Sequence, residues 1–293
     1  MPELPEVETV RQGLAPAMIG ARIESVVLAR ADLRTPFSER FVERLVGRTI
    51  VKLSRRAKYI LVHLDSGEAL IMHLGMSGSF RIERDGKKTA PGEFHFARAK
   101  DAAHDHVTIG LSNGARIVYN DPRRFGSMRI EPLDQAGDAA PLKGLGLEPL
   151  GDDLDGAALA RLFAGRKGPL KAALLDQRLI AGLGNIYVCE ALHRAGLSPK
   201  RPAGAIALKS GAPSAKAHAL ARAIRAVLEE AVAAGGSTLR DHRQPNGALG
   251  YFQHCFQVYD KEGAACPKPR CKGRILRIVQ SGRSTFYCPR CQR

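Results

Sequence analysis

Four cysteines crowd into the last 28 residues of this 293-residue chain, and their spacing constrains the fold more than any other feature. Four residues separate Cys266 from Cys271, two separate Cys288 from Cys291, and sixteen lie between the pairs. This spacing predicts two knuckles that hold one tetrahedral Zn²⁺ ion. Because four thiolates leave no position open for water, we expect the ion to be structural.

The residues between the two cysteine pairs predict a β-hairpin, with strands over 274–279 and 284–287. A hairpin of this size has no core of its own, so we expect it to fold around the metal. The tail from 264 to 293 carries eight basic residues and no acidic one, which favours contact with nucleic acid. The other two cysteines, Cys189 and Cys255, are interpreted as buried structural thiols.

The chain as a whole is strongly basic. Its 45 lysines and arginines exceed its 29 acidic residues, which gives a net charge of +16. Such an excess is expected of a surface that neutralises phosphates and releases their counterions. No apolar stretch is long enough for a transmembrane helix, and the acidic, proline-broken start is unlike a secretory signal. We therefore expect a cytoplasmic protein with no membrane partner.

Residues 1–130 predict one helix followed by a strand-rich domain. Val7, Val10, Leu14 and Met18 recur at helical spacing, and Gly20 ends the pattern. Turn residues predict hairpins at 65–67 and 113–114. The expected strands are 23–28, 49–53, 59–64, 69–74, 107–111 and 116–119. This domain is predicted to be a β-sandwich or a barrel behind the helix.

The rest of the chain divides into further segments. Charged residues, glycine and proline at 83–104 predict a mobile surface loop. An apolar stripe before two glycines predicts that the second domain is helical; its residues are Leu220, Ile224, Val227, Leu228 and Ala231. The predicted divisions are a linker over 131–151, a helical domain over 152–236, a loop and strand over 237–257 and the metal-binding tail over 258–293. The fold class is therefore α+β, with several domains.

The second residue, Pro2, is a candidate nucleophile. Removal of Met1 before this proline would expose a secondary amine, which at an ordinary pKa of about 7.7–8.0 is partly neutral near pH 7. A helix that begins just after the amine disfavours its protonated form further. Such an amine can form a Schiff base with an aldehyde-like sugar carbon, and Glu3 can transfer the proton that the reaction requires. A chain that keeps Met1 has no such amine.

Six blocks of sequence resemble the bacterial formamidopyrimidine-DNA glycosylases, in the order in which that family has them. The first block is residues 2–9 (Pro-Glu-Leu-Pro-Glu-Val-Glu-Thr). The others are 55–59 (Arg-Arg-Ala-Lys-Tyr), 73–78 (His-Leu-Gly-Met-Ser-Gly), 121–126 (Asp-Pro-Arg-Arg-Phe-Gly), 182–187 (Gly-Leu-Gly-Asn-Ile-Tyr) and 250–252 (Gly-Tyr-Phe). The zinc-binding tail follows, so the resemblance covers nearly the whole chain. Its first knuckle has four residues between the cysteines where the family usually has two.

The resemblance implies a bifunctional enzyme that excises oxidised purines from duplex DNA and then cuts the strand by β- and δ-elimination. In this family the N-terminal proline attacks C1′ of the damaged nucleotide and the next glutamate is the general acid and base, which implies these roles for Pro2 and Glu3. Lys58 corresponds to a lysine assigned to proton transfer in β-elimination and to phosphate contact. Arg283 corresponds to an arginine linked to phosphate binding and δ-elimination.

The same resemblance implies the contacts with DNA. Met76, Arg123 and Phe125 match three side chains that fill the hole left by an extruded nucleotide. Their chemistry suits the task, because methionine adapts its shape, arginine hydrogen-bonds bases and phenylalanine stacks on them. The remaining implied contacts are His73, His104, Arg166, Lys171 and Asn185.

The resemblance also names the domains and the partners. The helical domain over 152–236 is expected to be a helix–two-turns–helix domain, and residues 237–257 a lesion-recognition loop and strand. The tail over 258–293 becomes a zinc-finger β-hairpin with one Zn²⁺. The protein is expected to bind damaged double-stranded DNA as a monomer.

Two other interpretations stay open. The endonuclease VIII-like enzymes share the proline and the zinc finger but prefer oxidised pyrimidines, and they normally have glycine where this chain has Leu4. A zinc-dependent DNA-binding protein without enzyme activity would account for the charge and the zinc finger. It would not account for the N-terminal block or for Lys58.

Overall fold

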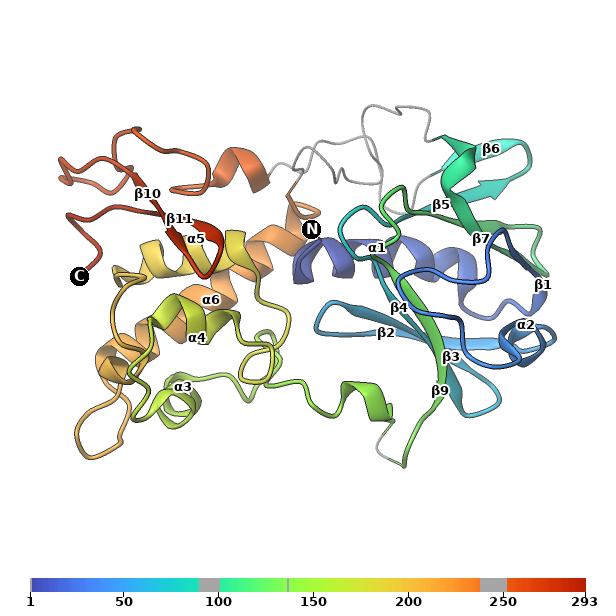
Figure 1. Cartoon of the computed structure of the whole chain (residues 1–293), viewed down its shortest axis with the longest axis horizontal. Coiled ribbons are helices and arrows are strands. Elements are labelled where there is room, and N and C mark those ends of the chain that lie inside the picture. Colours follow the sequence, from blue (N-terminus) through green and yellow to red (C-terminus); the bar gives the residue numbers. More distant parts are fainter. Residues whose placement is uncertain (1, 90–100, 136, 238–251) are drawn as a thin grey trace. The chain divides into compact units, whose positions relative to one another are not determined.

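The structure is a computed structural model of the chain and describes residues 2–89, 101–135, 137–237 and 252–293. The chain forms two compact units (Figure 1). The first unit contains Met1–Lys143 and Val232–Gln253, and the second contains Gly144–Ala231 and His254–Arg293.

The first unit begins with the predicted helix, α1 (Leu4–Met18). Its first turn contains Pro5 and Glu6. Both suit a helix N-terminus, because proline has no amide hydrogen to leave unpaired and a carboxylate is favourable at the positive end of the helix dipole. All four residues of the predicted apolar stripe are buried. Gly20 follows with a φ of 82°, and the chain turns away from the helix there.

Two antiparallel sheets make up most of the first unit (Figure 1). One has the strand order β1-β7-β8-β5-β6 and the other the order β2-β3-β4-β9. The strands of the first sheet are β1 (Ile23–Leu28), β5 (Ser79–Arg84), β6 (Lys87–Thr89), β7 (Asp105–Leu111) and β8 (Arg116–Asn120). Those of the second are β2 (Ile50–Arg56), β3 (Tyr59–Leu64), β4 (Glu68–His73) and β9 (Ser127–Pro132). Every strand predicted within residues 1–130 is present, and its ends lie within three residues of the prediction, whereas β5, β6 and β9 were not predicted.

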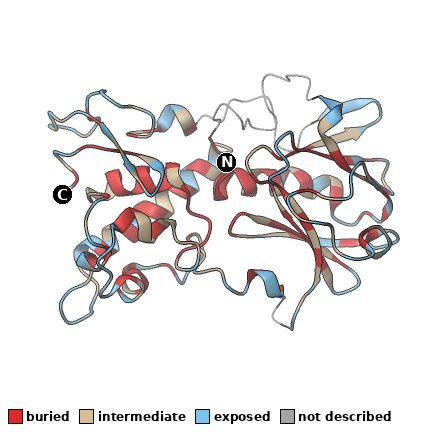
Figure 2. Ribbon diagram, in the orientation of Figure 1, coloured by how far each residue is buried: buried red, intermediate tan, exposed pale blue. Residues whose placement is uncertain are grey.

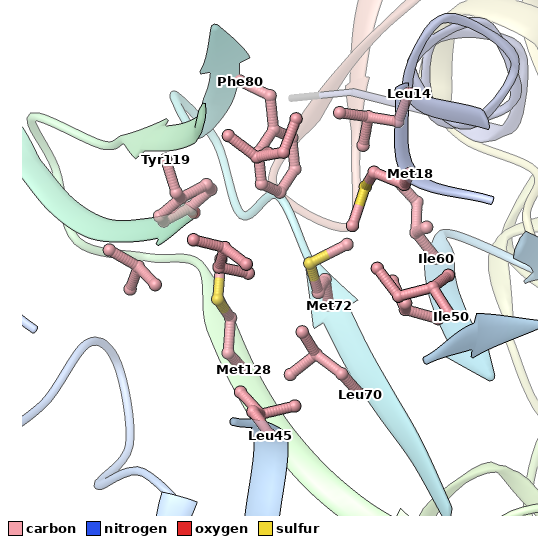
Figure 3. Packing of buried hydrophobic residues seen from close by; sticks show 14 of the residues in the cluster. Leu14, Met18, Leu45, Ile50, Ile60, Leu70, Met72, Phe80, Tyr119 and Met128 are labelled. Carbon is pink, nitrogen blue, oxygen red and sulfur yellow. The ribbon is translucent and has the colours of Figure 1, made fainter. Parts of the chain in front are cut away.

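One hydrophobic core joins both sheets to α1 and to the short helix α2 (Phe41–Leu45). Figure 3 shows side chains from α1 (Met18), from the second sheet (Met72) and from the first sheet (Phe80 and Tyr119) within this core. Because each sheet buries one face against the same core, the unit is a β-sandwich. Buried residues run along α1 and the strands of both sheets (Figure 2). The predicted α+β fold class is confirmed.

The prediction of a loop over 83–104 is wrong in part. β5 continues to Arg84, and β6 pairs with it to form a hairpin. The signal was present in the sequence, because Asp85 and Gly86 form an Asp-Gly turn with φ angles of 50° and 73°, which suits a two-residue hairpin. Residues 90–100 lie outside the described residues, and a 3-10 turn at Ala102–His104 precedes β7. In the predicted linker, β9 extends to Pro132 and a second 3-10 turn covers Ala140–Leu142.

The second unit contains the helices α3 (Gly156–Phe163), α4 (Leu170–Leu175) and α5 (Asn185–Ala195) and most of α6 (Ala215–Ala233). The stripe that predicts α6 is confirmed, since all five of its residues are buried. Gly235 and Gly236 follow this helix with φ angles of 71° and 87°. Among the described residues, no helix has both the length and the apolar character needed to cross a membrane.

The predicted C-terminal hairpin is confirmed as β10 (Leu276–Gln280) and β11 (Arg283–Tyr287). Ser281 and Gly282 join the strands with φ angles of 50° and 71°, the left-handed pair that matches the twist of a two-residue hairpin. A small core lies beneath the hairpin and includes Cys189 of α5; its other buried members are Val258, Cys266, Ile275, Phe286 and Cys288.

The strand predicted within 237–257 is not present in the residues that the structure describes. Phe252–Cys255 instead forms a 3-10 turn. This segment pairs with no strand of the described sheets, so its backbone closes local hydrogen bonds. Residues 238–251, most of the predicted lesion-recognition loop, lie outside the described residues. Cys189 is buried as predicted, but Cys255 is exposed.

Candidate functional site

Pro2 and Glu3 are buried at the start of α1. The Glu3 residue is only 4% exposed, and its amide N–H donates to Glu6 Oε2 at 2.8 Å. α1 begins two residues after Pro2, so the positive end of the helix dipole lies beside the N-terminus. The sequence-predicted nucleophile and acid are therefore next to a fixed helix end, in a place with little access for water.

The other oxygen of Glu6 binds a distant part of the chain. Glu6 Oε1 accepts hydrogen bonds from the backbone N–H of Ser237 at 2.7 Å and from its hydroxyl at 2.9 Å. Gly236, at a φ of 87°, approaches so closely that a Cβ there would lie 3.0 Å from this oxygen. One buried carboxylate thus holds both Glu3 and the first residue of the predicted lesion-recognition segment. The sequence analysis did not single out Glu6.

Lys58 lies in the two-residue turn between β2 and β3 and is 8% exposed. The preceding Ala57 has a φ of 53°, a conformation that costs a non-glycine residue energy and is common at functional turns. Arg55 donates to the Ala57 carbonyl oxygen at 2.8 Å and forms an ion pair with Glu8 of α1 at 3.2 Å. This arginine ties the turn that carries Lys58 to the first half of α1.

Glu8 is held ionised by its arginine neighbours. Burial by itself would raise the pKa of the Glu8 carboxyl, but the hydrogen bonds from Arg11 and the charges of Arg11 and Arg55 outweigh it and lower the pKa. The Glu8 carboxylate thus remains an anchor for Arg55 under neutral conditions.

His73 ends β4 and lies beside the Lys58 turn. Its ring packs against Tyr59 with ring centroids 4.8 Å apart, and its Nδ1 accepts the N–H of Gly75 at 3.1 Å. Burial lowers the pKa of His73 to about 4, with help from the charges of Lys58 and Arg34. The imidazole is therefore neutral at pH 7, with its proton on Nε2, where it can donate to a phosphate.

The three side chains predicted to fill the hole left by an extruded nucleotide, here called the wedge residues, lie on two neighbouring turns. Met76 is half-buried in the turn after β4, while Arg123 and Phe125 are exposed in the turn before β9. Phe125 is 41% exposed, and the Arg123 guanidinium lies 5.0 Å from the centre of its ring. Phe125 is therefore not a core residue, and its exposed ring beneath an arginine suits contact with bases.

His104 lies next to the second of these turns. It is half-buried at the end of the 3-10 turn before β7, and its carbonyl oxygen accepts the N–H of Asp121 at 3.0 Å. The structure thus brings together Lys58 with His73, and Met76 with Arg123, Phe125 and His104. All of these residues belong to the first unit.

In the second unit, α4, two turns and α5 form the predicted helix–two-turns–helix element. Gln177 shapes the turns: its side-chain oxygen accepts the N–H of Gly182 at 2.8 Å, and its side-chain nitrogen donates to the Leu183 carbonyl oxygen at 2.9 Å. Asn185 is the first residue of α5. Its Nδ2 donates to the Ser284 carbonyl oxygen of β11 at 2.9 Å, so the helix start is fixed to the zinc-finger hairpin.

Lys171 binds the same strand, β11, from inside the second unit. The side chain donates to the Ser284 carbonyl oxygen at 3.1 Å and to the Thr285 hydroxyl at 2.6 Å, and the residue is 1% exposed. A lysine so enclosed is placed to support β11 rather than to reach a phosphate at the surface. A single sequence gives no sign of this burial.

Arg283 and Arg166 have exposed side chains. Arg283 is the first residue of β11, next to the backbone that Lys171 and Asn185 hold. Arg166 follows α3, where its Nε donates to the Leu162 carbonyl oxygen at 2.8 Å.

The four terminal cysteines form the predicted metal site. Their sulfur atoms all lie within 4.8 Å of one another, and the pairs Cys266–Cys291 and Cys271–Cys288 are 3.7 Å apart. Zn–S bonds of about 2.3 Å in a tetrahedron require sulfur–sulfur edges of about 3.8 Å. The four-residue knuckle therefore fits one structural zinc ion as well as the shorter one does.

Residues around the zinc site fix its shape. A Cβ on Gly273 would lie 2.6 Å from the Cys288 sulfur, so only glycine fits there. The buried His193 of α5 places Nε2 3.5 Å from the Cys266 sulfur and Nδ1 2.9 Å from the Gln257 side-chain oxygen. These contacts attach the zinc finger to α5, the helix that Asn185 begins.

A buried carboxylate makes a second attachment. Glu190 of α5 is fully buried and accepts three backbone N–H bonds of 2.8–3.0 Å, from Gln257, Val258 and Tyr259. The sequence analysis missed Glu190 and His193, because only the folded chain shows what a helical residue faces. Their polarity within the mostly apolar middle of the helix was the one available signal.

Comparisons with known proteins cover the chain from end to end. Residues 1–128 match the formamidopyrimidine-DNA glycosylase N-terminal domain, and residues 145–243 match the H2TH domain of the same enzymes. Residues 269–293 match a zinc finger found in FPG and IleRS.

Full-length relatives carry one name. The chain is 61% identical to the formamidopyrimidine-DNA glycosylase of Beijerinckia indica and 64% identical to that of Methylocella silvestris, with complete coverage of both chains in each case.

Solved structures agree with the sequence relatives. The MutM (FPG) protein from Thermus thermophilus is similar at a TM-score of 0.80 and 40% identity, over 99% of this chain and 98% of that one. Lactococcus lactis Fpg in complex with DNA that contains N7-benzyl-Fapy-dG is similar at a TM-score of 0.81 and 33% identity, with complete coverage of both chains.

Proposed function

Since the chain belongs to the formamidopyrimidine-DNA glycosylase family and so acts as a DNA glycosylase on damaged DNA, we propose that it removes oxidised purines through a covalent bond to Pro2 and then cuts the strand. The lesions are 8-oxoguanine and formamidopyrimidines in duplex DNA. The observation that carries this proposal is the N-terminus, where Pro2 and Glu3 are buried together at the fixed start of α1.

The first step replaces the bond from the sugar to the damaged base. The amine of Pro2, once Met1 is removed, attacks C1′ as the bond from C1′ to the base breaks. Glu3 takes the proton that the amine loses and supplies the one that opens the sugar ring, which leaves an iminium ion between Pro2 and C1′. The nearby helix end favours the neutral, reactive form of the amine.

The later steps break the DNA backbone. Loss of a proton from C2′ of the iminium ion expels the 3′ phosphate, and a second elimination expels the 5′ phosphate. Lys58 is buried in a turn anchored to α1 and would transfer protons and hold phosphate there. Arg283, exposed at the start of β11, would hold phosphate during the second elimination.

Access to the base requires that its nucleotide leave the helix stack, at a cost of a few kcal/mol. The exposed Phe125, with Arg123 stacked on it and Met76 in the neighbouring turn, would occupy the resulting hole. The relatives from Lactococcus lactis were solved with damaged or abasic DNA, which supports damaged DNA as the partner. Arg166, Asn185, His73 and His104 remain proposed phosphate contacts.

Borohydride trapping tests the proposal. Processed protein, checked by mass to lack Met1, is mixed with duplex DNA containing 8-oxoguanine, and borohydride should reduce the iminium ion to a stable adduct that maps to Pro2. The Pro2→Gly variant keeps an N-terminal amine and should trap less. Protein that retains Met1 should give no adduct.

Absence of an adduct with processed protein would overturn the covalent bond to Pro2. Faster release of thymine glycol than of 8-oxoguanine would favour the endonuclease VIII-like alternative.

A further inference from the structure

One buried carboxylate, which the proposed function does not use, binds both turns that carry the wedge residues: the turn of Met76 and the turn of Arg123 and Phe125. Asp121 is fully buried, and its two oxygens accept three hydrogen bonds. Oδ1 accepts the hydroxyl of Ser77 at 2.5 Å, while Oδ2 accepts the N–H of Gly126 at 2.8 Å and the hydroxyl of Tyr119 at 3.2 Å. Ser77 belongs to the turn of Met76, and Gly126 follows Phe125.

The Ser77 hydroxyl links the turns a second time. Its oxygen accepts the backbone N–H of Arg123 at 3.2 Å while its hydrogen goes to Asp121. The backbone of Arg124 then takes a φ of 55°, which is costly for a residue with a side chain, and its N–H donates to the Asp121 carbonyl oxygen at 3.2 Å. The chain between Arg123 and Phe125 is therefore held in a conformation that it would not keep alone.

Glycines bring the turns into direct contact. A Cβ on Gly75 would overlap the backbone of Phe125 and Gly126, and a Cβ on Gly78 or Gly126 would overlap the Tyr119 hydroxyl. The Tyr119 ring is itself part of the sandwich core (Figure 3). The hydroxyl, the carboxylate and three glycines thus fix the two turns to each other and to the core.

The hydrogen-bond roles in this cluster are determined. Burial and the nearby Asp121 charge raise the pKa of Tyr119 well above its ordinary value, so its hydroxyl is a donor at any pH of interest. All three groups that face Asp121 are donors, and only a carboxylate accepts all of them. A side-chain amide at this position would turn an N–H toward another donor and leave a buried group unpaired.

We propose that Asp121, with Tyr119 and Ser77, is a positioning residue that keeps Met76, Arg123 and Phe125 in the shape required to enter the DNA stack. The inference rests on the proposed function. Turns with exposed side chains otherwise lose conformational freedom when they enter DNA, and that loss weakens insertion. Chemistry at C1′ does not require the wedge when the nucleotide is already unstacked. Asp121 should therefore matter for duplex DNA and not for single-stranded DNA.

The test compares two substrates for the whole, zinc-loaded protein without Met1. Single-turnover cleavage is measured on 8-oxoguanine in a duplex and on an abasic site in a single strand. Asp121→Asn should slow the duplex reaction 10- to 100-fold and change the single-strand reaction less than 2-fold. Tyr119→Phe should show the same pattern at 3- to 10-fold, because it removes one of the three donors. Asp65→Asn is the matched control, since Asp65 accepts a backbone N–H in another turn of the same unit.

A double-mutant cycle separates positioning from a general structural role. Met76→Ala removes one wedge side chain, so Asp121→Asn added to it should slow the duplex reaction by much less than it does alone. Fluorescence of 2-aminopurine next to the lesion should report reduced unstacking in Asp121→Asn and Tyr119→Phe. If Asp121→Asn does not fold, as judged by its thermal midpoint, Tyr119→Phe and Ser77→Ala carry the test.

The outcomes distinguish this inference from the proposed function. A wild-type protein that fails to cleave the single-stranded abasic site would overturn the proposed function itself. Only the positioning role would be overturned if the wild-type protein is active and the folded variants keep its ratio of duplex to single-strand rates. Equal losses of rate on both substrates are one such case.

Discussion

Lys171 and Arg283 are two basic residues close together in space that differ in their exposure. Both adjoin the backbone of Ser284, but Lys171 is enclosed and donates into β11, whereas the Arg283 side chain is exposed at the start of that strand. Only an exposed cation displaces counterions from a phosphate, so the two residues should differ in their effect on the salt dependence of DNA binding.

We expect Arg283→Gln to lower the slope of log K against log salt by about 0.9, the value of one phosphate contact. Lys171→Met should leave that slope unchanged while it lowers the thermal midpoint, because Thr285 loses a buried partner. Fluorescence anisotropy with an uncleavable abasic analogue at several salt concentrations measures both. A fall in slope for Lys171→Met would show that its side chain reaches the DNA after all.

For single residues, the sequence predicted the members of the zinc site better than it predicted what surrounds each side chain. The fit of the four cysteines follows the prediction, because their spacing is visible locally. The burial of Lys171 and the carboxylate bonds of Asp121 and Glu6 depend on residues as far as 231 positions away. No local sequence pattern predicts these long-range contacts.

The zinc finger is the element whose existence depends most on a bound ion. Its small core contains the metal ligands and only a few further side chains. Removal of zinc should therefore release β10 and β11, while the strands of the β-sandwich keep their own core. Hydrogen exchange of backbone amides distinguishes the two regions.

We expect chelation of zinc to accelerate exchange in β10 and β11 at least 10-fold and to leave β3 and β4 unchanged. Cys271→Ser should have the same effect without a chelator. Cys255→Ser is the matched control, because Cys255 is exposed and outside the site, and it should retain one zinc per chain. Slow exchange in β10 and β11 of a zinc-free protein would show that the hairpin folds without the ion.

Elements were predictable where the pattern was strong and local. Alternating or continuous apolar residues gave six strands of the two sheets, and the apolar stripe gave α6, but β5 and β9 were not predicted. β6 was missed because its sequence, Lys-Lys-Thr, carries no apolar pattern, although the Asp85-Gly86 turn marked the hairpin. The expected strand near 252 failed for the opposite reason, since an apolar residue such as Phe252 can be buried without any strand partner.

Acid stability is a property of the whole molecule to which His73 contributes. Its pKa is about 4 in the folded chain, below the ordinary value of 6.5. The unfolded chain therefore binds a proton at this site in the window from about pH 6.5 to 4, where the folded chain does not. By linkage, the free energy of unfolding falls as the pH drops through that window and is unaffected by His73 above it.

Urea unfolding at pH 7 and pH 5 measures this contribution. The wild-type chain should lose about 1–2 kcal/mol more than His73→Gln between these two values. His63→Gln offers a milder comparison, because burial and Lys52 lower the pKa of that histidine by less. Equal losses in the wild type and His73→Gln would mean that His73 is protonated in the folded protein.

The bond between Glu6 and Ser237 has a consequence for the order in which the protein becomes competent. A ribosome that adds about 5–20 residues per second needs on the order of 12 to 50 seconds to reach Ser237. During that time the N-terminus of the nascent chain has already left the ribosome, but the Glu6 carboxylate still lacks its two hydrogen bonds from Ser237. The proposed nucleophile is thus synthesised first, whereas the hydrogen bonds of its neighbour Glu6 are completed only after residue 237 has been made.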